Sequence, residues 1–339
     1  MEGKVRIGVL GCANIAERLS LPAILKTEGA ELVSVASRTR AKAEEWAARF
    51  GARAEDSYDA QIAAPDIDAV YIPLPIGLHR EWALKAAEAG KHVICEKSLA
   101  ENLDSAKGII AAARKAGVVL FENFACGYHP QHGAVRAEVA KGTIGKPFLF
   151  RGAFGFPPFD KSSFRYDKSL GGSCLYEVGA YPVFMARKIL GAEPQKVYCT
   201  LFYDVERGVD IKGNAQIEFP NELVAEVAFS MDSVYQNNYS LWGQKGLLRT
   251  SRAFAIPADM VPPLELLTNE NFKETVVPVE APAAAQFELI FADFCDVVRS
   301  GDAARREGMY ETLLAQARTL EALRISAKEG RAVALSEFQ

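Results

Sequence analysis

Lys97 stands where a polar side chain can take part in proton chemistry. It follows Glu96 and the apolar run His92–Cys95, which is typical of a strand buried on both faces. In an open parallel sheet, ligands bind in the crevice beyond the carboxyl ends of the strands. An ammonium group there can donate to a substrate oxygen, or relay a proton if burial lowers its pKa. The alternative is an ordinary surface lysine.

A turn near the start of the chain is suited to a bound pyrophosphate. It follows an apolar strand and opens a helix, as in the dinucleotide-binding pattern G-x-G-x-x-G/A. A glycine allows the tight turn, and the N–H groups at the helix N-terminus would hold the pyrophosphate. Alanine replaces the usual middle glycine, and a plain strand-to-helix turn is the alternative. The expected cofactor-binding residues of this turn are Gly11, Cys12, Ala13, Asn14 and Ile15.

The residues after the second expected strand indicate which dinucleotide binds. Where an NAD enzyme usually has an acidic residue for the ribose 2′-hydroxyl, this chain has Ser37-Arg38-Thr39-Arg40. A guanidinium and two hydroxyls would bind a 2′-phosphate that a carboxylate would repel. We therefore expect NADP(H) rather than NAD(H), held by Ser37, Arg38 and Thr39. The alternative is that Arg38 and Arg40 are solvated residues at a helix start.

A doubly wound sheet is needed to hold these residues in place. Short apolar runs alternate with amphipathic patterns in the first third of the chain, which predicts parallel strands with right-handed crossovers. The expected strands are Val5–Leu10, Leu32–Ala36, Ala69–Ile72, His92–Cys95 and Val118–Phe121. The expected helices are Ile15–Leu25, Arg40–Phe50, Leu78–Ala89 and Leu103–Ala116.

Beyond Glu122 the sequence changes to β-rich segments with interleaved polar and apolar residues. This predicts a large, mostly antiparallel, open-faced sheet with helices on one face. The expected strands are Phe148–Phe154, Val197–Tyr203, Gly213–Phe219, Leu223–Phe229 and Tyr239–Trp242, and the expected helices are His132–Lys141, Leu175–Leu190, Gln286–Arg299 and Gly308–Glu329. The fold class is therefore α/β, with a Rossmann domain over residues 1–122 and an α+β domain for substrate binding and oligomerisation over residues 123–339.

The composition fits two globular domains and disfavours several classes of function. Of the 339 residues, 49% are hydrophobic and 24% are charged, which is enough apolar material for two cores. The net charge of -4, without a basic block, lacks the footprint of a nucleic-acid binder. Six scattered cysteines form no C-x-x-C pair, so we expect neither disulfides nor a metal site. With no signal peptide or long apolar span, we expect a cytoplasmic protein and no membrane partner.

Four motifs follow one another along the chain. They are the opening Gly8–Ala16, the turn Pro73-Leu74-Pro75 with His79, the segment Glu96-Lys97-Ser98-Leu99-Ala100, and the segment Gly171–Tyr181. Together they resemble the glucose-fructose oxidoreductase / inositol dehydrogenase / rhizopine-catabolism (Gfo/Idh/MocA) family over nearly the whole chain. The resemblance implies an NAD(P)-dependent oxidoreductase acting on CH–OH or C=O groups. It further implies that the cofactor site includes Pro73, Leu74, His79, Glu96 and Lys97.

The same resemblance makes Lys97 and Tyr181 the catalytic pair. On a regular helix, Glu177 and Tyr181 are i and i+4 and share a face. A phenol near an ammonium is a better acid, so the pair could protonate a carbonyl oxygen as hydride reaches its carbon. The alternative is that Tyr181 is a buried aromatic residue. The chain departs from the family pattern at Ser98, Ser173 and Glu177, which replace proline, glycine and aspartate.

Polar residues at the start of the second domain are expected to line the substrate site. The string Tyr128-His129-Pro130-Gln131-His132 resembles NADPH-dependent 3-ketoreductases of nucleoside-diphosphate deoxysugars. The expected substrate-binding residues are Asn123, Tyr128, His129, Gln131, Arg165, Glu177 and Tyr181, with Arg165 facing a pyrophosphate. A metal site at His129 and His132 lacks a third ligand, so no metal is expected. The alternatives are that residues 128–132 serve in helix capping and packing, and that Arg165 is an exposed loop residue.

Three functions stay open. The first is NADPH-dependent reduction of a keto group on a nucleotide-linked deoxysugar. The second is an NADP-dependent dehydrogenase of a free sugar or a trans-dihydrodiol, and the third is an NADP(H)-binding protein without turnover. The presence of both Lys97 and Tyr181 argues against the third. A sheet face without helices commonly packs against another subunit, so we expect a homodimer or homotetramer.

Overall fold

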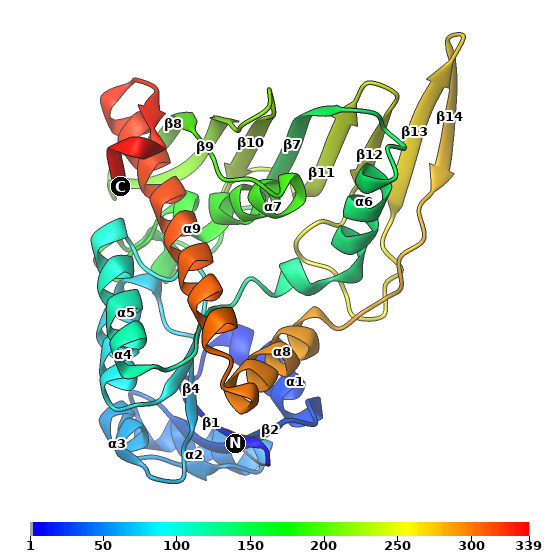
Figure 1. Cartoon of the computed structure of the whole chain (residues 1–339). Coiled ribbons are helices and arrows are strands. Elements are labelled where there is room, and N and C mark those ends of the chain that lie inside the picture. The colour runs from blue at the N-terminus through cyan, green and yellow to red at the C-terminus, as the bar shows by residue number, and fades with distance from the viewer. Residues whose placement is uncertain (1–2, 339) are drawn as a thin grey trace. The chain divides into compact units, whose positions relative to one another are not determined.

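Two β-sheets organise the computed structural model, which describes residues 3–338 (Figure 1). Within these residues the first sheet has six strands in the order β3-β2-β1-β4-β5-β6, and the second has nine in the order β14-β13-β12-β11-β7-β10-β9-β8-β15. Each sheet belongs to its own compact unit. One unit comprises the chain up to Ala125 together with Phe287–Ala317, and the other comprises Cys126–Gln286 and the residues from Arg318 onward.

The first sheet is parallel throughout, as the sequence predicts. Its strands are β1 Val5–Leu10, β2 Ala30–Ala36, β3 Arg53–Ala54, β4 Ala69–Ile72, β5 His92–Cys95 and β6 Leu120–Glu122. Every residue of β4 is buried, which explains the unbroken apolar run. The strand order reverses between β1 and β4, and this switch point is where a doubly wound sheet binds its ligand.

The helices of this unit follow the expected pattern with local differences. They are η1 Ala16–Ser20, α1 Leu21–Lys26, α2 Arg40–Phe50, α3 Tyr58–Ala63, α4 Ile76–Glu88 and α5 Leu103–Ala116. The expected helix 15–25 is present, but its first part, η1, is a π-helical turn rather than regular α-helix. Pro22 lacks the N–H that an α-helical bond to the Arg18 carbonyl would require, and a wider turn precedes it. Helix α3 is unpredicted; Ser57 caps it by accepting from the Ala60 N–H at 3.0 Å.

The first unit also contains residues that lie far along the chain. Helix α8 Gln286–Ser300 and the first half of α9 Ala303–Glu329 pack on the Rossmann core. The rings of Phe291 and Tyr71 pack edge-on with their centres 5.6 Å apart, and the Tyr310 hydroxyl donates to the Val118 carbonyl. The expected boundary after residue 122 is close to the first change of unit. Residues 287–317, however, pack with the first unit rather than with the second, because their apolar side chains complete its core.

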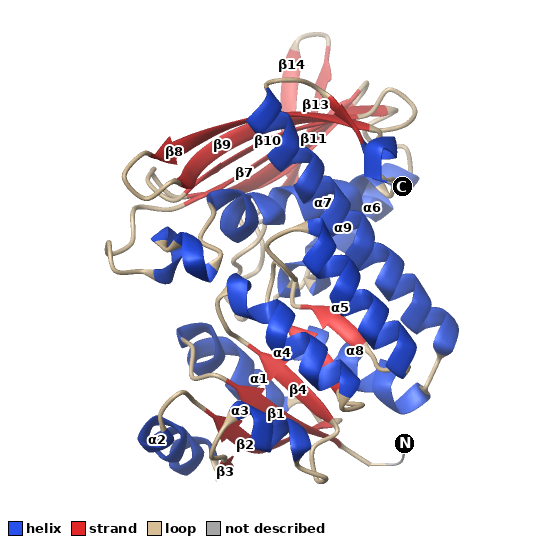
Figure 2. Cartoon of the chain, turned by 90° about the vertical axis from the view of Figure 1, so that its left-hand side faces the viewer, coloured by secondary structure: helices blue, strands red, loops and turns tan. Residues whose placement is uncertain are grey.

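The second sheet is mostly antiparallel, as predicted, with β7 and β10 parallel to each other. Its strands are β7 Pro147–Gly155, β8 Lys196–Asp204, β9 Val209–Glu218, β10 Val224–Ser230, β11 Gln236–Gly243, β12 Gly246–Thr250, β13 Leu264–Glu270, β14 Lys273–Pro278 and β15 Val333–Ala334. Helices α6 Pro130–Ala140 and α7 Ala180–Leu190 lie on one side of this sheet, and the other side carries no helix within residues 3–338 (Figure 2).

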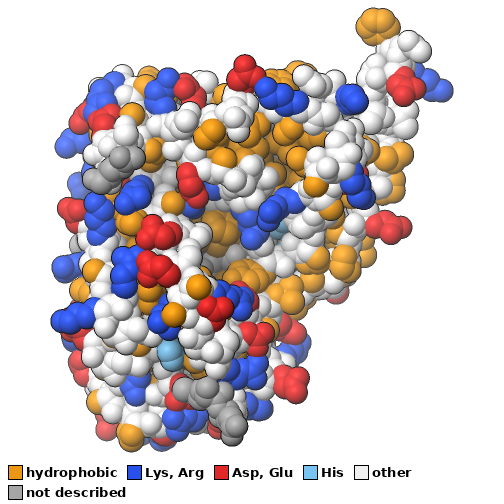
Figure 3. All heavy atoms as spheres, viewed as in Figure 1, with side chains coloured by type: hydrophobic (Ala, Val, Ile, Leu, Met, Phe, Trp, Pro, Cys, Tyr) orange, Lys and Arg blue, Asp and Glu red, His pale blue; other side chains and the backbone are white. Residues whose placement is uncertain are grey.

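The surface and the cysteines fit the composition. Lys and Arg side chains are interspersed with Asp and Glu on the face seen in Figure 3. No helix in the described chain is both long and apolar enough to span a membrane. No disulfide joins the six cysteines, which all lie in the described part of the chain, and residues 3–338 contain no group of three metal-ligating side chains.

Candidate active site

The turn after β1 has the geometry of a pyrophosphate site. Gly11 has φ +118°, and its N–H donates to the Ala36 carbonyl at 2.9 Å. A Cβ atom on Gly11 would lie 2.6 Å from Leu74 Cδ2, so that side chain would have to shift, and the positive φ would strain any other residue. Ala16 is fully buried, whereas the expected ligands Cys12, Ala13, Asn14 and Ile15 stay partly or fully exposed. The turn therefore keeps backbone N–H groups at the carboxyl end of β1.

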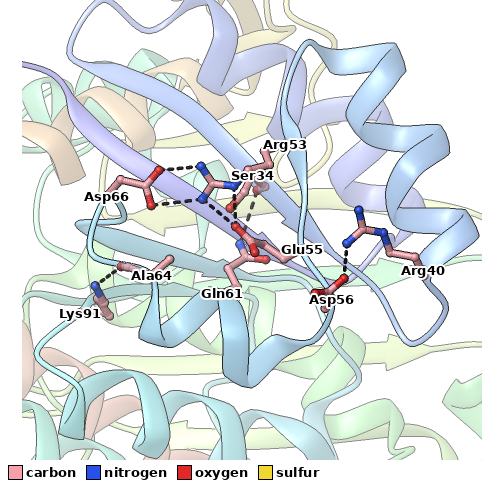
Figure 4. Close-up of polar contacts among 9 residues, drawn as sticks. All are labelled: Ser34, Arg40, Arg53, Glu55, Asp56, Gln61, Ala64, Asp66 and Lys91. Carbon is pink, nitrogen blue, oxygen red and sulfur yellow. Dashed lines mark hydrogen bonds and ion pairs between the residues drawn. The ribbon is translucent and has the colours of Figure 1, made fainter.

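The two arginines after β2 have different surroundings. Arg40 is bound by Glu44 at 2.8 Å and by Asp56, as Figure 4 shows for Asp56. Arg38 is exposed and forms no hydrogen bond or ion pair with the described residues. Ser37 is half-buried and Thr39 is exposed beside it. Of the two guanidinium groups, that of Arg38 is therefore the one available to an anion.

Lys42 is a further, unpredicted cation near this site. Its carbonyl accepts from Cys12 Sγ at 3.9 Å, which brings the first turn of α2 against the Gly11 turn. The Lys42 side chain is exposed and makes no ion pair with the described residues. Its position in the first turn of the helix that follows the second strand is the sequence feature that could have identified it.

His79 joins the loops that follow β4 and β5. Its Nε2 lies 2.7 Å from the Leu74 carbonyl oxygen and its Nδ1 lies 2.9 Å from that of Ser98. The ring is fully buried, and the turn of Pro73 and Leu74 is held against it. The peptide bond between Lys97 and Ser98 is cis. These contacts describe a positioning role, and direct cofactor contact by His79 stays a prediction.

A buried hydrogen-bond network surrounds Lys97. The Glu96 Oε1 atom accepts from Tyr71 Oη at 2.7 Å and from Asn123 Nδ2 at 2.6 Å. Burial raises the pKa of Glu96 above its ordinary value, and these hydrogen bonds oppose the rise. Glu122 fixes the adjoining loop by accepting from the Leu99 N–H at 2.8 Å. Tyr71 and Glu122 were not predicted, because Tyr71 lies within an apolar strand pattern and Glu122 directly follows one.

In the second unit, the helix expected over 175–190 is present, but it is not regular α-helix throughout. It consists of the π-helical turn η5 Leu175–Gly179 followed by α7. The Ala180 N–H bonds to the Leu175 carbonyl, five residues back, and Pro182 then removes a donor from the next turn. Glu177 and Tyr181 therefore do not have the regular α-helical offset. π-Helical turns are frequent at functional sites.

Asp210 anchors the start of this helix. Its Oδ2 atom accepts from the Leu175 N–H at 2.7 Å, and the Ser173 side chain also bonds to it. Burial raises the pKa of Asp210 above its ordinary value. The serine that replaces the family's glycine thus takes part in the cap. The preceding Gly172 is required, because a Cβ atom there would lie 2.5 Å from the Arg165 carbonyl oxygen.

Arg165 and Glu177, both predicted substrate ligands, lie together. Arg165 Nε is 3.3 Å from Glu177 Oε2, with 28% of the arginine side chain and 8% of the glutamate side chain exposed. The guanidinium also lies over the rings of Phe159 and Phe164, at 4.4 and 4.6 Å from their centres. Tyr181 is half-buried, and its ring packs edge-on against Phe154 at 4.9 Å.

The residues around α6 have mainly structural contacts. His129 Nδ1 accepts from the Gln131 N–H at 3.3 Å and caps the helix. The Gln131 amide donates to the Arg252 carbonyl at 2.7 Å and accepts from Thr250 Oγ1 at 3.3 Å. These contacts favour the capping and packing alternative, so substrate contact by His129 and Gln131 stays a prediction. Tyr128 is half-buried.

Comparisons with known proteins match both units. Residues 5–124 match the oxidoreductase family with an NAD-binding Rossmann fold, and residues 132–249 match the GFO/IDH/MocA C-terminal domain. The chain is 35% identical to the dTDP-3,4-didehydro-2,6-dideoxy-alpha-D-glucose 3-reductase of Actinomadura kijaniata over 96% of both chains. It is 32% identical to a D-xylose 1-dehydrogenase (NADP(+)) of Haloferax volcanii over 97% of this chain and 99% of that protein.

A solved structure agrees with the first of these relatives. The crystal structure of KijD10, a 3-ketoreductase from Actinomadura kijaniata in complex with NADP and TDP-benzene, superposes with a TM-score of 0.90. The two proteins share 35% identity, and the match covers 96% of this chain and 98% of KijD10.

Proposed function

Because the chain belongs to the GFO/IDH/MocA oxidoreductase family, we propose that it uses NADPH to reduce a keto group on a nucleotide-linked deoxysugar. One observation carries the proposal. Lys97 lies at the carboxyl end of β5, where the Glu96 network and the bond of His79 to Ser98 hold its loop. The chain around it matches a dTDP-deoxysugar 3-reductase along 96% of its length. The first unit then binds the dinucleotide and the second binds the sugar.

NADPH, when bound, supplies a hydride to the carbonyl carbon of the sugar. The residues of this chain provide the proton that turns the carbonyl oxygen into a hydroxyl. Tyr181 transfers its phenolic proton to that oxygen, and the Lys97 ammonium donates a hydrogen bond to it and makes the phenol a better acid. Variants of KijD10 replace one lysine and one tyrosine, which are separated in that chain by the same number of residues as Lys97 and Tyr181. This equal spacing supports the assignment of the pair.

The surroundings of Gly11 and Arg38 suit NADPH. The Gly11 turn has the positive φ that favours glycine and leaves N–H groups at the sheet switch point. Arg38, unlike Arg40, has no carboxylate partner in the described chain. Arg38 therefore binds the 2′-phosphate, with Ser37, Thr39 and Lys42 as its neighbours. The expectation of NADP over NAD rests on this difference.

Arg165 distinguishes a nucleotide-linked sugar from a free one. Its guanidinium is oriented by Phe159, Phe164 and Glu177, and a planar donor of this kind suits a diphosphate. A free sugar offers no such group. Replacing Arg165 by alanine therefore raises the KM for a nucleotide sugar and leaves the KM for a free sugar unchanged.

A direct assay tests the function. Purified protein is mixed with NADPH and a dTDP-linked 3-keto-deoxysugar, and oxidation of NADPH is followed by absorbance. We expect turnover with this substrate and a far lower kcat/KM for D-xylose with NADP+. The match to a D-xylose dehydrogenase makes xylose oxidation the second candidate. Efficient xylose oxidation without turnover of the nucleotide sugar would replace the first function by the second.

The helix-free face of the second sheet is proposed to join two copies of the chain. Exposed or half-buried apolar residues lie in cross-strand register on β11 to β14: Trp242, Leu247, Leu267 and Val276. Such a row commonly packs against another subunit. We expect a dimer or tetramer by light scattering, and a smaller assembly for Trp242→Lys. Val234→Lys, at an exposed position outside the row, is the control. A monomeric wild-type protein would contradict this proposal.

A further inference from the structure

One buried oxygen beside Lys97 lacks a partner. Asn123 is 3% exposed, and within residues 3–338 its Oδ1 atom has no hydrogen bond. Buried polar atoms in native proteins are nearly always paired, and leaving one unpaired is destabilising. An orphaned carbonyl oxygen at the end of a strand that borders a candidate active site therefore indicates an absent donor.

The hydrogen-bond network fixes which way this amide faces. Ser20 Oγ lies 2.7 Å from Tyr71 Oη, and Tyr71 donates to the Glu96 carboxylate, so the Ser20 hydroxyl donates to the tyrosine oxygen. The Asn123 Nδ2 group and the Lys97 N–H also donate to Glu96. A carboxylate accepts but does not donate, so the NH₂ group of Asn123 must face Glu96. The Oδ1 atom consequently faces away from the carboxylate and serves only as an acceptor.

The topology places Asn123 on the nicotinamide side of the sheet. In the proposed binding mode, the Gly11 turn at the switch point holds the pyrophosphate, and Arg38 after β2 lies on the adenosine side. The other half of a dinucleotide then extends over the ends of β4, β5 and β6. Asn123 directly follows β6, and its N–H donates to the Cys95 carbonyl at 2.7 Å, two residues before Lys97.

From these observations we propose that Asn123 Oδ1 accepts a hydrogen bond from the carboxamide N–H of the nicotinamide. The bond sets the rotation of the ring about its glycosidic link and so selects which ring face meets the substrate. Tyr71 and Ser20 are positioning residues, because they act on the cofactor only through Glu96 and Asn123. The inference rests on the proposed use of NADP(H).

A cofactor analogue tests the bond without any turnover. In 3-acetylpyridine adenine dinucleotide phosphate, a methyl group replaces the carboxamide NH₂ and removes the N–H donors. We expect wild-type protein to bind NADP+ about five- to tenfold more tightly than the analogue, as expected for one hydrogen bond, in a fluorescence or calorimetric titration. Equal dissociation constants are the result expected if a buried water, rather than the carboxamide, bonds to the Asn123 oxygen. They would overturn the proposal. Failure to bind either dinucleotide would instead contradict the proposed function.

Variants separate the carboxamide from other donors. Asn123→Leu preserves the size of the side chain, and Asn123→Ala serves as a second variant if the first fails to fold. In both, the preference for NADP+ over the analogue should disappear, so that the ratio of the two dissociation constants is about one. Tyr71→Phe should reduce it partly, because Glu96 loses one donor and holds Asn123 less firmly. Tyr310→Phe removes another buried hydroxyl of the same unit, bonded to Val118, and should leave the preference unchanged. An unchanged preference in both Asn123 variants, with a raised KM for the sugar, would assign the oxygen to a substrate hydroxyl and overturn the proposal.

Discussion

His79 and Ser98 connect two loops of the candidate active site, since the His79 Nδ1 atom lies 2.9 Å from the Ser98 carbonyl oxygen. The other ring nitrogen lies 2.7 Å from the Leu74 carbonyl oxygen. His79→Leu would remove the ring N–H that donates to one of these carbonyl oxygens, at a cost of about 1–3 kcal/mol in the free energy of unfolding. We expect kcat to fall as well, because the loop that carries Lys97 loses a support. Urea unfolding and steady-state kinetics measure the two effects. An unchanged kcat would show that His79 contributes to stability and does not position Lys97.

Lys97→Ala and Tyr181→Phe test the proposed proton donors. Each variant should fold and bind NADPH normally, yet lose at least about 10²-fold in kcat, as expected when a general acid is removed. Fluorescence titration with NADPH provides the binding control. Near-normal turnover in both variants would refute the catalytic pair.

The two arginines after β2 form a matched pair for cofactor specificity. Arg38→Ala should weaken NADPH binding by about tenfold or more while NADH binding changes little, because a charge-assisted bond to the 2′-phosphate is lost. Arg40→Ala should preserve the preference, because Glu44 and Asp56 already bind that guanidinium. Dissociation constants of NADPH and NADH, measured for both variants and the wild type, test this difference. An equal loss of NADPH and NADH in Arg38→Ala would argue against the phosphate contact.

His132 should make stability depend on pH. Burial, with His129 and Lys188 nearby, lowers the pKa of His132 from 6.5 to about 3. The neutral ring is thus favoured in the folded state, so its contribution is complete above pH 6.5 and is lost as the pH falls toward 3. The slope is at most about 1.4 kcal/mol per pH unit. His132→Gln should flatten the curve of unfolding free energy in that window. A smaller slope should remain in this variant, because burial also lowers the pKa values of His92 and His129.

Regular elements were predicted well where one periodicity dominates. Helices α2 and α5 and strands β1, β4 and β5 begin and end where the sequence indicates. The wider turns η1 and η5 were not predicted, because their side chains fit an α-helical pattern and only the following prolines disclose the change. Residues that join strand ends through space were also missed. The hydroxyl of Tyr71 and the carboxylates of Glu122 and Asp210 acquire their roles only when distant loops come together.

The return of residues 287–317 to the first core has a consequence for biosynthesis and for engineering. A ribosome will have made nearly the whole chain before Tyr310 and Leu313 become available to that core. A nascent or recombinant fragment that ends near Ala125 would therefore expose an apolar surface and tend to aggregate. A chimera that exchanges dinucleotide specificity between relatives should transplant both segments together, and one that carries the N-terminal segment alone should be recovered mainly as insoluble protein.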